Sequence, residues 1–224
     1  MSTRFFTCLI TLFLATNATA VKIPHTAEIK LLVVDGLWNH DWQRATNSTE
    51  QKSDLIRLFN DNDLTGWGYR KKSADTIVFE SFDGMTETQE NRFFAKGGIL
   101  TCNPYIEGYV ERYGAIWTRK EFPKDFILTL EFRASKNADS GIFLRGTQLQ
   151  CRDYLLAGPY KTLKNYKPQD WNKIEVVVKN NVARCTCNGE ILEEALIIPA
   201  TGPIGFESDL GQMEYRNIQI RELE

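Results

Sequence analysis

The chain has 224 residues, with 27 Lys and Arg against 29 Asp and Glu, and a formal net charge of −2. This balance leaves no excess of basic residues for a nucleic-acid surface, so no nucleic-acid partner is expected. Hydrophobic residues make up 42% of the chain and charged residues 25%, which excludes a disordered or fibrous protein. The length fits one domain with a short additional segment.

Residues 1–20 have the pattern of a secretory signal peptide. Arg4 precedes an apolar run at 5–15, and the small residues Ala18 and Ala20 occupy positions −3 and −1 of a cut after Ala20. The apolar run is far shorter than the roughly 20 residues that a transmembrane helix needs. We therefore expect an exported protein, periplasmic or extracellular, without a membrane span. The alternative is a buried N-terminal strand.

Residues 21–53 form a separate short segment that ends in a polar linker. Its apolar strand at 30–34 continues into the sequence DGLWNHDW, which ends at Trp42. This stretch resembles the opening strand and loop of ThuA-like trehalose-utilisation domains. The resemblance ends after fewer than about twenty residues, and one strand cannot form a parallel sheet. We interpret the segment as a remnant or a docking strand.

Four of the five cysteines lie outside the predicted signal peptide: Cys102, Cys151, Cys185 and Cys187. Export would place them in an oxidising compartment, and four cysteines allow three pairings. Cys185 and Cys187 are two residues apart in a strand-like run, so they share one face and a bond between them would be strained. With only 2 His in the chain a zinc site is not expected, and structural thiols and disulfides both stay open.

From residue 54 onward the pattern is typical of an all-β domain, 54–224. The clearest predicted strands are 126–133, 174–178, 182–187 and 215–221. Asn188-Gly189 after the third of these is a strong hairpin signal. Because no helix-length amphipathic run occurs, we expect a β-sandwich or jelly roll. Its predicted core includes Trp67, Trp171 and the apolar residues of 126–133.

Several catalytic and metal motifs can be excluded. The sequence that begins at Asp61 resembles the start of a calcium loop, but the twelfth position, which needs Glu, is Lys72. No nucleotide-binding loop, zinc-protease motif or serine-hydrolase elbow occurs. His25 and His40 both precede residue 54, so acid–base work inside the β domain must fall to Asp, Glu, Tyr, Lys or a water tuned by Arg.

A series of polar residues on strand-like segments remains as a candidate site. It comprises Glu131, Arg133, Asp139, Ser140, Arg145, Gln148, Gln150 and Asp153, with Trp117 and Tyr160 nearby in sequence. On one concave sheet such groups could bind sugar hydroxyls while an aromatic ring stacks on the sugar. The alternative is that Glu131 and Arg133 form cross-strand ion pairs on a solvated face.

Ordered motifs across nearly all of 54–223 resemble one known family. They are LFND with LTGW (58–67), GGIL (97–100), WT (117–118), DF (125–126), EFR (131–133), SGIFLRG (140–146), WN (171–172), NG (188–189), GPIG (202–205) and YRNI (215–218). The family is the 3-keto-disaccharide hydrolases, also described as a 3-keto-glucoside 1,2-lyase/3-keto-2-hydroxy-glucal hydratase domain. The resemblance implies a concanavalin-like jelly-roll fold and a carbohydrate substrate.

The chemistry implied by this resemblance is elimination followed by hydration. A ketone at carbon 3 acidifies the hydrogen on carbon 2, so a base can remove it and the aglycone leaves from carbon 1; water then completes net hydrolysis. The resemblance suggests Glu131 or Asp153 as the base and Arg133 and Arg145 at the keto or enolate oxygen. Substrate contacts would come from Trp117, Gln148, Gln150 and Tyr160. A divalent metal could replace the arginines, although no ligand set stands out.

The sequence departs from the family pattern at two positions. Gln148 stands where an acidic residue is usual, and Asp139 stands where Asn is usual. The loss of a carboxylate at Gln148 would imply another base, another substrate or a domain that only binds. A noncatalytic carbohydrate-binding module is therefore the main alternative, and a secreted interaction module with a merely solvated polar face is a third. An enzyme of the proposed kind requires Glu131, Arg133, Arg145, Gln150 and Asp153 to converge on one pocket.

Overall fold

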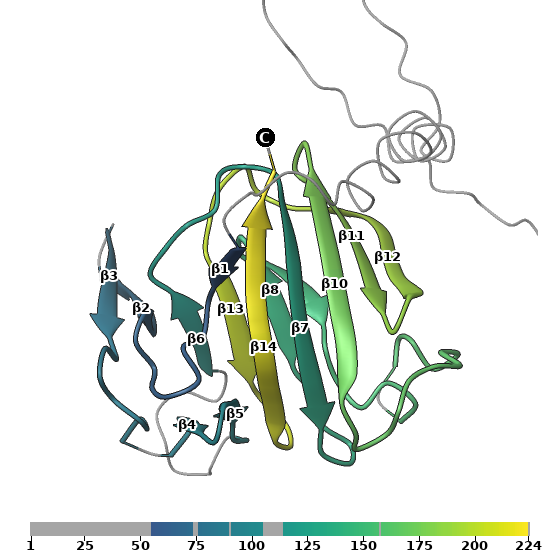
Figure 1. Ribbon diagram of the computed structural model, residues 1–224, viewed down its shortest axis with the longest axis horizontal. Coiled ribbons are helices and arrows are strands. Elements are labelled where there is room, and N and C mark those ends of the chain that lie inside the picture. Colours follow the sequence, from purple (N-terminus) through teal and green to yellow (C-terminus); the bar gives the residue numbers. More distant parts are fainter. Residues whose placement is uncertain (1–54, 74–75, 90, 105–113, 157, 224) are drawn as a thin grey trace, which may run out of the picture. The chain divides into compact units, whose positions relative to one another are not determined.

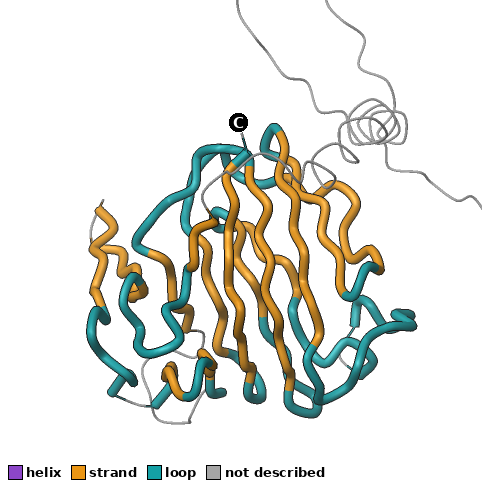
Figure 2. The backbone as a smooth tube through the Cα atoms, in the orientation of Figure 1, coloured by secondary structure: helices purple, strands orange, loops and turns teal. Residues whose placement is uncertain are grey.

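The computed structural model describes residues 55–73, 76–89, 91–104, 114–156 and 158–223. The predicted signal peptide, the ThuA-like segment with both histidines and the linker lie outside the described residues. Within those ranges every regular element is a β-strand (Figure 2). It follows that the described residues include no helix long and apolar enough to cross a membrane.

The strands form two antiparallel sheets, which confirms the predicted all-β jelly-roll sandwich (Figure 1). The eight-stranded sheet has the order β12-β11-β10-β7-β14-β5-β4, with β1 also paired to β14. Its strands are β1 (Leu55–Arg57), β4 (Phe93–Lys96), β5 (Ile99–Cys102), β7 (Phe126–Ala134), β10 (Asn172–Lys179), β11 (Val182–Cys187), β12 (Glu190–Ile197) and β14 (Met213–Glu222).

The six-stranded sheet has the order β3-β2-β6-β13-β8-β9. Its strands are β2 (Trp67–Ser73), β3 (Thr76–Ser81), β6 (Gly114–Thr118), β8 (Gly141–Leu144), β9 (Thr147–Gln150) and β13 (Ile204–Ser208). In Figure 1 this sheet lies behind and to the left of the long strands β14, β7 and β10. Both sheets combine hairpins of consecutive strands, such as β8 with β9, with pairs that are distant in sequence, such as β13 with β6.

Aromatic contacts join the two sheets across one hydrophobic core. Phe206 of β13 stacks on Tyr215 of β14 with ring centroids 4.1 Å apart, and Trp67 of β2 stacks on the same phenylalanine at 5.2 Å. Alternate residues of β7 point into this core, from Phe126 to Phe132, as predicted. Burial of Trp67 is confirmed as well.

The predicted hairpin turns are confirmed by their backbone conformation. Asn188 and Gly189, between β11 and β12, have φ of 48° and 84°. Asn180 and Asn181, between β10 and β11, have φ of 49° and 63°. Positive φ at both central residues matches the twist of antiparallel strands, and Asn and Gly accept it at low cost.

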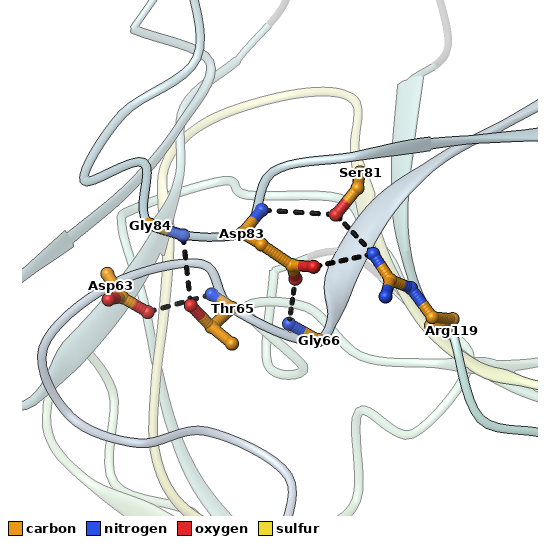
Figure 3. A network of polar contacts seen from close by, with 7 residues as sticks. All are labelled: Asp63, Thr65, Gly66, Ser81, Asp83, Gly84 and Arg119. Carbon is orange, nitrogen blue, oxygen red and sulfur yellow. Dashed lines mark hydrogen bonds and ion pairs between the residues drawn. The ribbon is translucent and has the colours of Figure 1, made fainter.

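A network of polar contacts holds the start of β2 beside the end of β6 (Figure 3). One carboxylate oxygen of Asp83 accepts a hydrogen bond from the amide of Gly66 at 2.8 Å, and the other lies 2.6 Å from Nη2 of Arg119. The hydroxyl of Thr65 accepts from the amide of Gly84 at 2.9 Å, and Asp63 accepts from the amide of Thr65 at 2.8 Å. The sequence that resembles a calcium loop therefore forms a turn.

All four cysteines of the described residues are buried and present as free thiols. Cys185 and Cys187 both belong to the core cluster, in agreement with the shared face predicted from their spacing. Burial raises the pKa of each of the four thiols, so they are poor nucleophiles in the folded protein. Of the two alternatives left open by the sequence, the structure shows structural thiols.

Candidate functional site: a groove on the six-stranded sheet

An open groove of about 470 Å³ lies on the outer face of the six-stranded sheet. It forms because β2 pairs with β6 only at Trp67 and Gly68. Beyond these two pairs the strands no longer bond to each other, and residues 69–72 line one side of the groove while Gly114 and Ala115 line the other. Trp117, Phe143 and Glu207 complete the lining.

The strand register places the functional side chains of this face in two neighbouring rows. Directly opposite residues of antiparallel strands share a face. Trp117 of β6 and Phe143 of β8 both pair with Gly205 of β13, which makes one row. Ala115 pairs with Glu207 in the next row along. An aromatic row therefore adjoins a row that carries a carboxylate.

Trp117 and Phe143 form an aromatic platform beside the groove. Their ring centroids are 4.8 Å apart and their planes are inclined by 26°. Gly205 makes this contact possible, because a Cβ there would lie only 2.6 Å from Cε3 of Trp117. The indole thus rests on the bare backbone of β13. Such a platform suits the apolar face of a sugar ring.

Glu207 is held by a relay of two glutamine side chains. Nε2 of Gln148 donates to Oε2 of Glu207 at 2.6 Å, and Nε2 of Gln150 donates to Oε1 of Gln148 at 3.1 Å. Gln148 reaches Glu207 across β8, over Gly141, where a Cβ would lie 2.4 Å from Nε2 of Gln148. Among the described residues, the buried Oε1 of Gln150 has no hydrogen-bond partner.

The environment of Glu207 raises the pKa of its carboxyl group to about 6. Burial is the largest cause, and the negative charges of Asp209 and Asp139 add to it. The hydrogen bond from Gln148 and the charge of Arg152 act in the opposite direction. A carboxyl group with this pKa can both accept and return a proton near neutral pH.

Glu131 and Arg133 lie on the other sheet, away from the groove. Both are on β7, where the alternating residues Leu130 and Phe132 fill the core. Glu131 accepts hydrogen bonds from Nε of Arg216 at 2.8 Å and from Nδ2 of Asn217 at 2.7 Å. Arg133 pairs with Glu214 at 2.5 Å. This is the cross-strand arrangement that the sequence left open as an alternative.

Trp171 is part of the same surface, so its predicted burial in the core is wrong. Its ring lies 4.0 Å from the guanidinium carbon of Arg216 and 4.8 Å from that of Arg133. The residue is half-buried. An amphipathic indole can satisfy its apolar surface against the planar guanidinium groups as well as in a core.

Arg145 is buried in the turn between β8 and β9 and binds backbone there. Its guanidinium donates to the carbonyl oxygens of Lys124 at 2.5 Å and Pro199 at 3.1 Å, and to Oδ1 of Asn181 at 3.0 Å. Burial lowers the pKa of this guanidinium. These contacts hold three loops together at one end of the sandwich.

Asp153 and Tyr160 are placed in the loops that follow β9. The fully buried Asp153 accepts hydrogen bonds from the hydroxyl of Tyr166 at 3.2 Å and from Nε2 of Gln169 at 3.1 Å. The hydroxyl of Tyr160 donates to Oε1 of Glu193 at 2.6 Å. Neither residue lines the groove.

The expected convergence on one pocket therefore does not occur. Of the eight predicted site residues, Trp117 lines the groove, and Gln148 and Gln150 form the relay beside it. Sequence reasoning missed Glu207 and Phe143. The alternation in IGFES, residues 204–208, predicts that Glu207 points to the outer face while Phe206 points into the core. Only the tertiary structure shows that Glu207 is hydrogen-bonded to Gln148.

Residues 54–221 match the family described as the 3-keto-alpha-glucoside-1,2-lyase-like domain. The chain belongs to this family. The resemblance seen in the sequence is thus confirmed for the β domain, and membership of the 3-keto-alpha-glucoside-1,2-lyase-like family supports a carbohydrate-active function. The ThuA-like character of 30–42 stays a prediction. No curated protein matches the sequence of this chain.

Solved structures resemble this member of the lyase-like family in fold. A protein from Parabacteroides distasonis, provisionally named a glycosyl hydrolase, is 16% identical with a TM-score of 0.57; the match covers 76% of this chain and 94% of that one. A lichenase from a mouse hindgut metagenome has 13% identity, a TM-score of 0.46 and coverage of 75% and 97%. The β-glucanase of Bacillus licheniformis is 9% identical with a TM-score of 0.45, and the match covers 78% of this chain and 100% of that one.

The family's chemistry raises the question of a metal ion. In the described ranges no group of three or more His, Cys, Asp or Glu side chains lies close enough together to hold one. The groove itself presents one carboxylate, that of Glu207. The described residues thus supply no ligand set for a metal ion, and the possible divalent metal stays a prediction.

Proposed function

We propose that the domain cleaves 3-keto-glucosides in the groove, with Glu207 as the acid–base residue. Ionised Glu207 takes the proton from carbon 2, and the electron pair of that C–H bond forms the enolate with the ketone at carbon 3. The bond from carbon 1 to the aglycone oxygen then breaks, and the aglycone leaves as an alcohol after taking up a proton. Water adds to the unsaturated sugar, so the net reaction is hydrolysis.

The observation that carries this proposal is the half-buried carboxyl group of Glu207 beside an aromatic platform. Its pKa of about 6 leaves it mostly ionised at neutral pH, yet basic enough to remove an acidified proton. Burial and Gln148 together set both its basicity and its orientation. Glu207 could also replace the acidic residue that the family usually has at position 148, because its carboxylate is hydrogen-bonded to Gln148.

The glutamine relay supplies the hydrogen-bond donors that an enolate requires. Each side-chain amide has two N–H donors, and the relay uses one from Gln148 and one from Gln150. The second donor of each amide is left for the keto oxygen, whose negative charge grows as the proton leaves. Trp117, supported by Phe143, stacks on the sugar face and holds carbon 2 toward the carboxylate.

The site of action follows from the signal-peptide prediction. Residues 1–20 would direct the protein to the periplasm or outside the cell, where 3-keto-glucosides would reach the groove from solvent. The alternative function is a carbohydrate-binding module that uses the same platform without chemistry. The presence of Gln148 instead of an acidic residue is the observation that favours it.

The test follows cleavage by proton NMR in deuterated water. The full protein is incubated with a 3-keto-glucoside and with its unoxidised parent, each with and without added divalent cation. Cleavage of the keto form alone, with deuterium incorporated at carbon 2, is the expected result. Binding of the keto sugar without cleavage or exchange would overturn the catalytic proposal and leave a binding module.

A pair of matched variants assigns the base. Glu207→Gln keeps the volume and the hydrogen bond to Gln148 and should lower kcat by about 10²- to 10⁴-fold. Glu175→Gln changes a carboxylate on the eight-stranded sheet and serves as the control. Full activity of Glu207→Gln would exclude Glu207 as the acid–base residue.

A further inference from the structure

The groove has a cationic end that the proposed cleavage chemistry does not use. Arg70 and Lys72 of β2 both line it. Gly68, Arg70 and Lys72 are alternate residues of β2, so they belong to the same face of the sheet, which is its outer face. Trp117 pairs with Gly68, which places Arg70 and Lys72 on the same face as the aromatic platform.

Much of this positive charge is left for a ligand. Lys71 also lines the groove, but its charge is balanced by Glu80, whose carboxylate lies 2.6 Å from Nζ of Lys71. Arg70 binds Oε1 of Glu121 through one nitrogen at 2.9 Å, which leaves other N–H donors of its guanidinium. In the part of the chain that the structure describes, Lys72 takes part in no ion pair of 4.0 Å or less.

The register gives the separation between these cations and the carboxylate. Ala115 of β6 pairs with Glu207 of β13. Gly68 of β2 pairs with Trp117 of β6, and Arg70 and Ala115 each lie two residues further along their antiparallel strands, toward the same end of the sheet. Because β2 and β6 no longer bond beyond Gly68, Arg70 lies at least about two strand spacings, or roughly 10 Å, from the strand position of Glu207. This distance leaves room for an aglycone between the bond that breaks at Glu207 and a group bound at Arg70.

We propose that the substrate's aglycone carries an anionic group, a carboxylate, sulfate or phosphate, which Arg70 and Lys72 bind. The inference rests on the proposed cleavage of 3-keto-glucosides and names the class of substrate. A guanidinium binds such groups through two parallel N–H bonds, and an ammonium adds a point charge. The whole chain has a net charge of −2, so attraction of an anion to the groove would come from this local positive charge and not from the overall charge.

The test compares aglycones that differ in charge. Three 3-keto-glucosides, with 4-carboxyphenyl, 4-sulfophenyl and neutral 4-carbamoylphenyl aglycones, are cleaved by the full protein in 20 mM and 500 mM NaCl. We expect kcat/KM for each anionic substrate to exceed that for the neutral one about tenfold at low salt. High salt should reduce the ratio toward one, because salt screens partly exposed charges.

Variants separate the groove from general surface charge. Lys72→Gln and Arg70→Gln should each lower the anionic-to-neutral ratio about threefold, and the double variant should abolish it. Lys173→Gln, on the eight-stranded sheet, should keep the wild-type ratio. Ratios are compared between variants, which cancels the intrinsic reactivity of each leaving group. Lys72 is exposed, so Lys72→Gln is expected to fold. It keeps the test valid even if Arg70→Gln destabilises the protein through loss of the ion pair with Glu121.

Each outcome separates the two proposals. Equal cleavage of charged and neutral substrates would overturn the anionic aglycone and leave the proposed function standing. A preference that persists in Lys72→Gln and Arg70→Gln would overturn the assignment to β2. No cleavage of any of the three would overturn the proposed function, and the anionic aglycone with it.

Discussion

Nε2 of Gln148 lies 2.6 Å from Oε2 of Glu207, although the strand β8 runs between the two residues. The contact exists because Gly141, which lies beneath it on β8, has no side chain. Gly141 is the first residue of β8, and the space above its backbone holds the side chain of Gln148. The absence of a Cβ at this position therefore allows the hydrogen bond that orients the carboxylate of Glu207.

Replacement of Gly141 by Ala should disconnect Gln148 from Glu207. The new Cβ would lie 2.4 Å from Nε2 and 2.6 Å from Cγ of Gln148, so this flexible side chain must move away. The lost hydrogen bond lowers the pKa of Glu207 in the native protein, and its removal should raise that pKa above about 6. The acidic limb of the pH–rate profile should move to higher pH.

A double-variant cycle checks the cause of that shift. Gln148→Ala alone should move the limb in the same direction, and Gly141→Ala combined with Gln148→Ala should add nothing further. Additive shifts would mean that Gly141 acts on Glu207 by another route.

Glu207→Gln should make the protein more stable at neutral pH. The folded-state pKa of about 6 lies above the ordinary glutamate pKa of 4.5, so the folded state holds the proton more tightly than the unfolded chain does. The stability that this provides is fully present below the unfolded pKa and is lost as pH rises through about 6. Discounted for partial exposure, the loss is about 1 kcal/mol.

Urea unfolding of both proteins at pH 4.5 and pH 7 measures this effect. The free energy of unfolding of Glu207→Gln relative to the wild type should rise between the two pH values by the same amount of about 1 kcal/mol. A difference that does not change with pH would show that Glu207 titrates normally.

Trp117→Ala should weaken substrate binding more than it slows the chemical step. The indole forms the platform with Phe143 and, among the described residues, takes no part in the hydrogen bonds of the glutamine relay. Loss of the stacking surface should raise KM about tenfold, which corresponds to about 1.4 kcal/mol. Trp117→Phe should restore much of the affinity. Trp171→Ala, on the other sheet, is the control, and an equal effect there would argue against the groove as the binding site.

Glu131→Gln decides between the two faces of the sandwich. Glu131 is bound to Arg216 and Asn217 on the eight-stranded sheet, so the geometry predicts less than a twofold change in kcat/KM. The pair is partly exposed, and its loss should cost less than about 1 kcal/mol of stability. A fall of about a hundredfold or more, with stability unchanged, would return Glu131 to the role of base that the family resemblance suggests.

Arg145→Ala should act on folding. The buried guanidinium satisfies the carbonyl oxygens of Lys124 and Pro199, and its removal leaves both without these donors. The expected loss in the free energy of unfolding is about 2 to 4 kcal/mol. Chemical denaturation measures it, with exposed Arg57→Ala as the comparison. A stable Arg145→Ala protein without activity would instead support the role at the keto oxygen suggested by the sequence.

The sequence by itself determined the class of fold, the family and much of the local structure. Alternation in 126–133 and the Asn-Gly turn at 188–189 depend on neighbouring residues only, because side chains of a strand alternate faces and few residues accept positive φ. Family motifs spread over residues 54–223 pointed to the jelly roll, since many of them are turns or core positions of that fold, such as Asn188-Gly189 and Trp67.

The composition of the site was decided only by the tertiary structure. Glu131 and Gln148 are both polar residues in strands whose sequences alternate between polar and apolar side chains. Nothing in the local sequence reveals that their strands, β7 and β9, belong to different sheets. Glu207 became a candidate because strand order brings β13 and β9 to either side of β8, with a glycine between them. A pKa of about 6 arises from burial and from Asp139 and Asp209 together, and burial is a property of the assembled sheets.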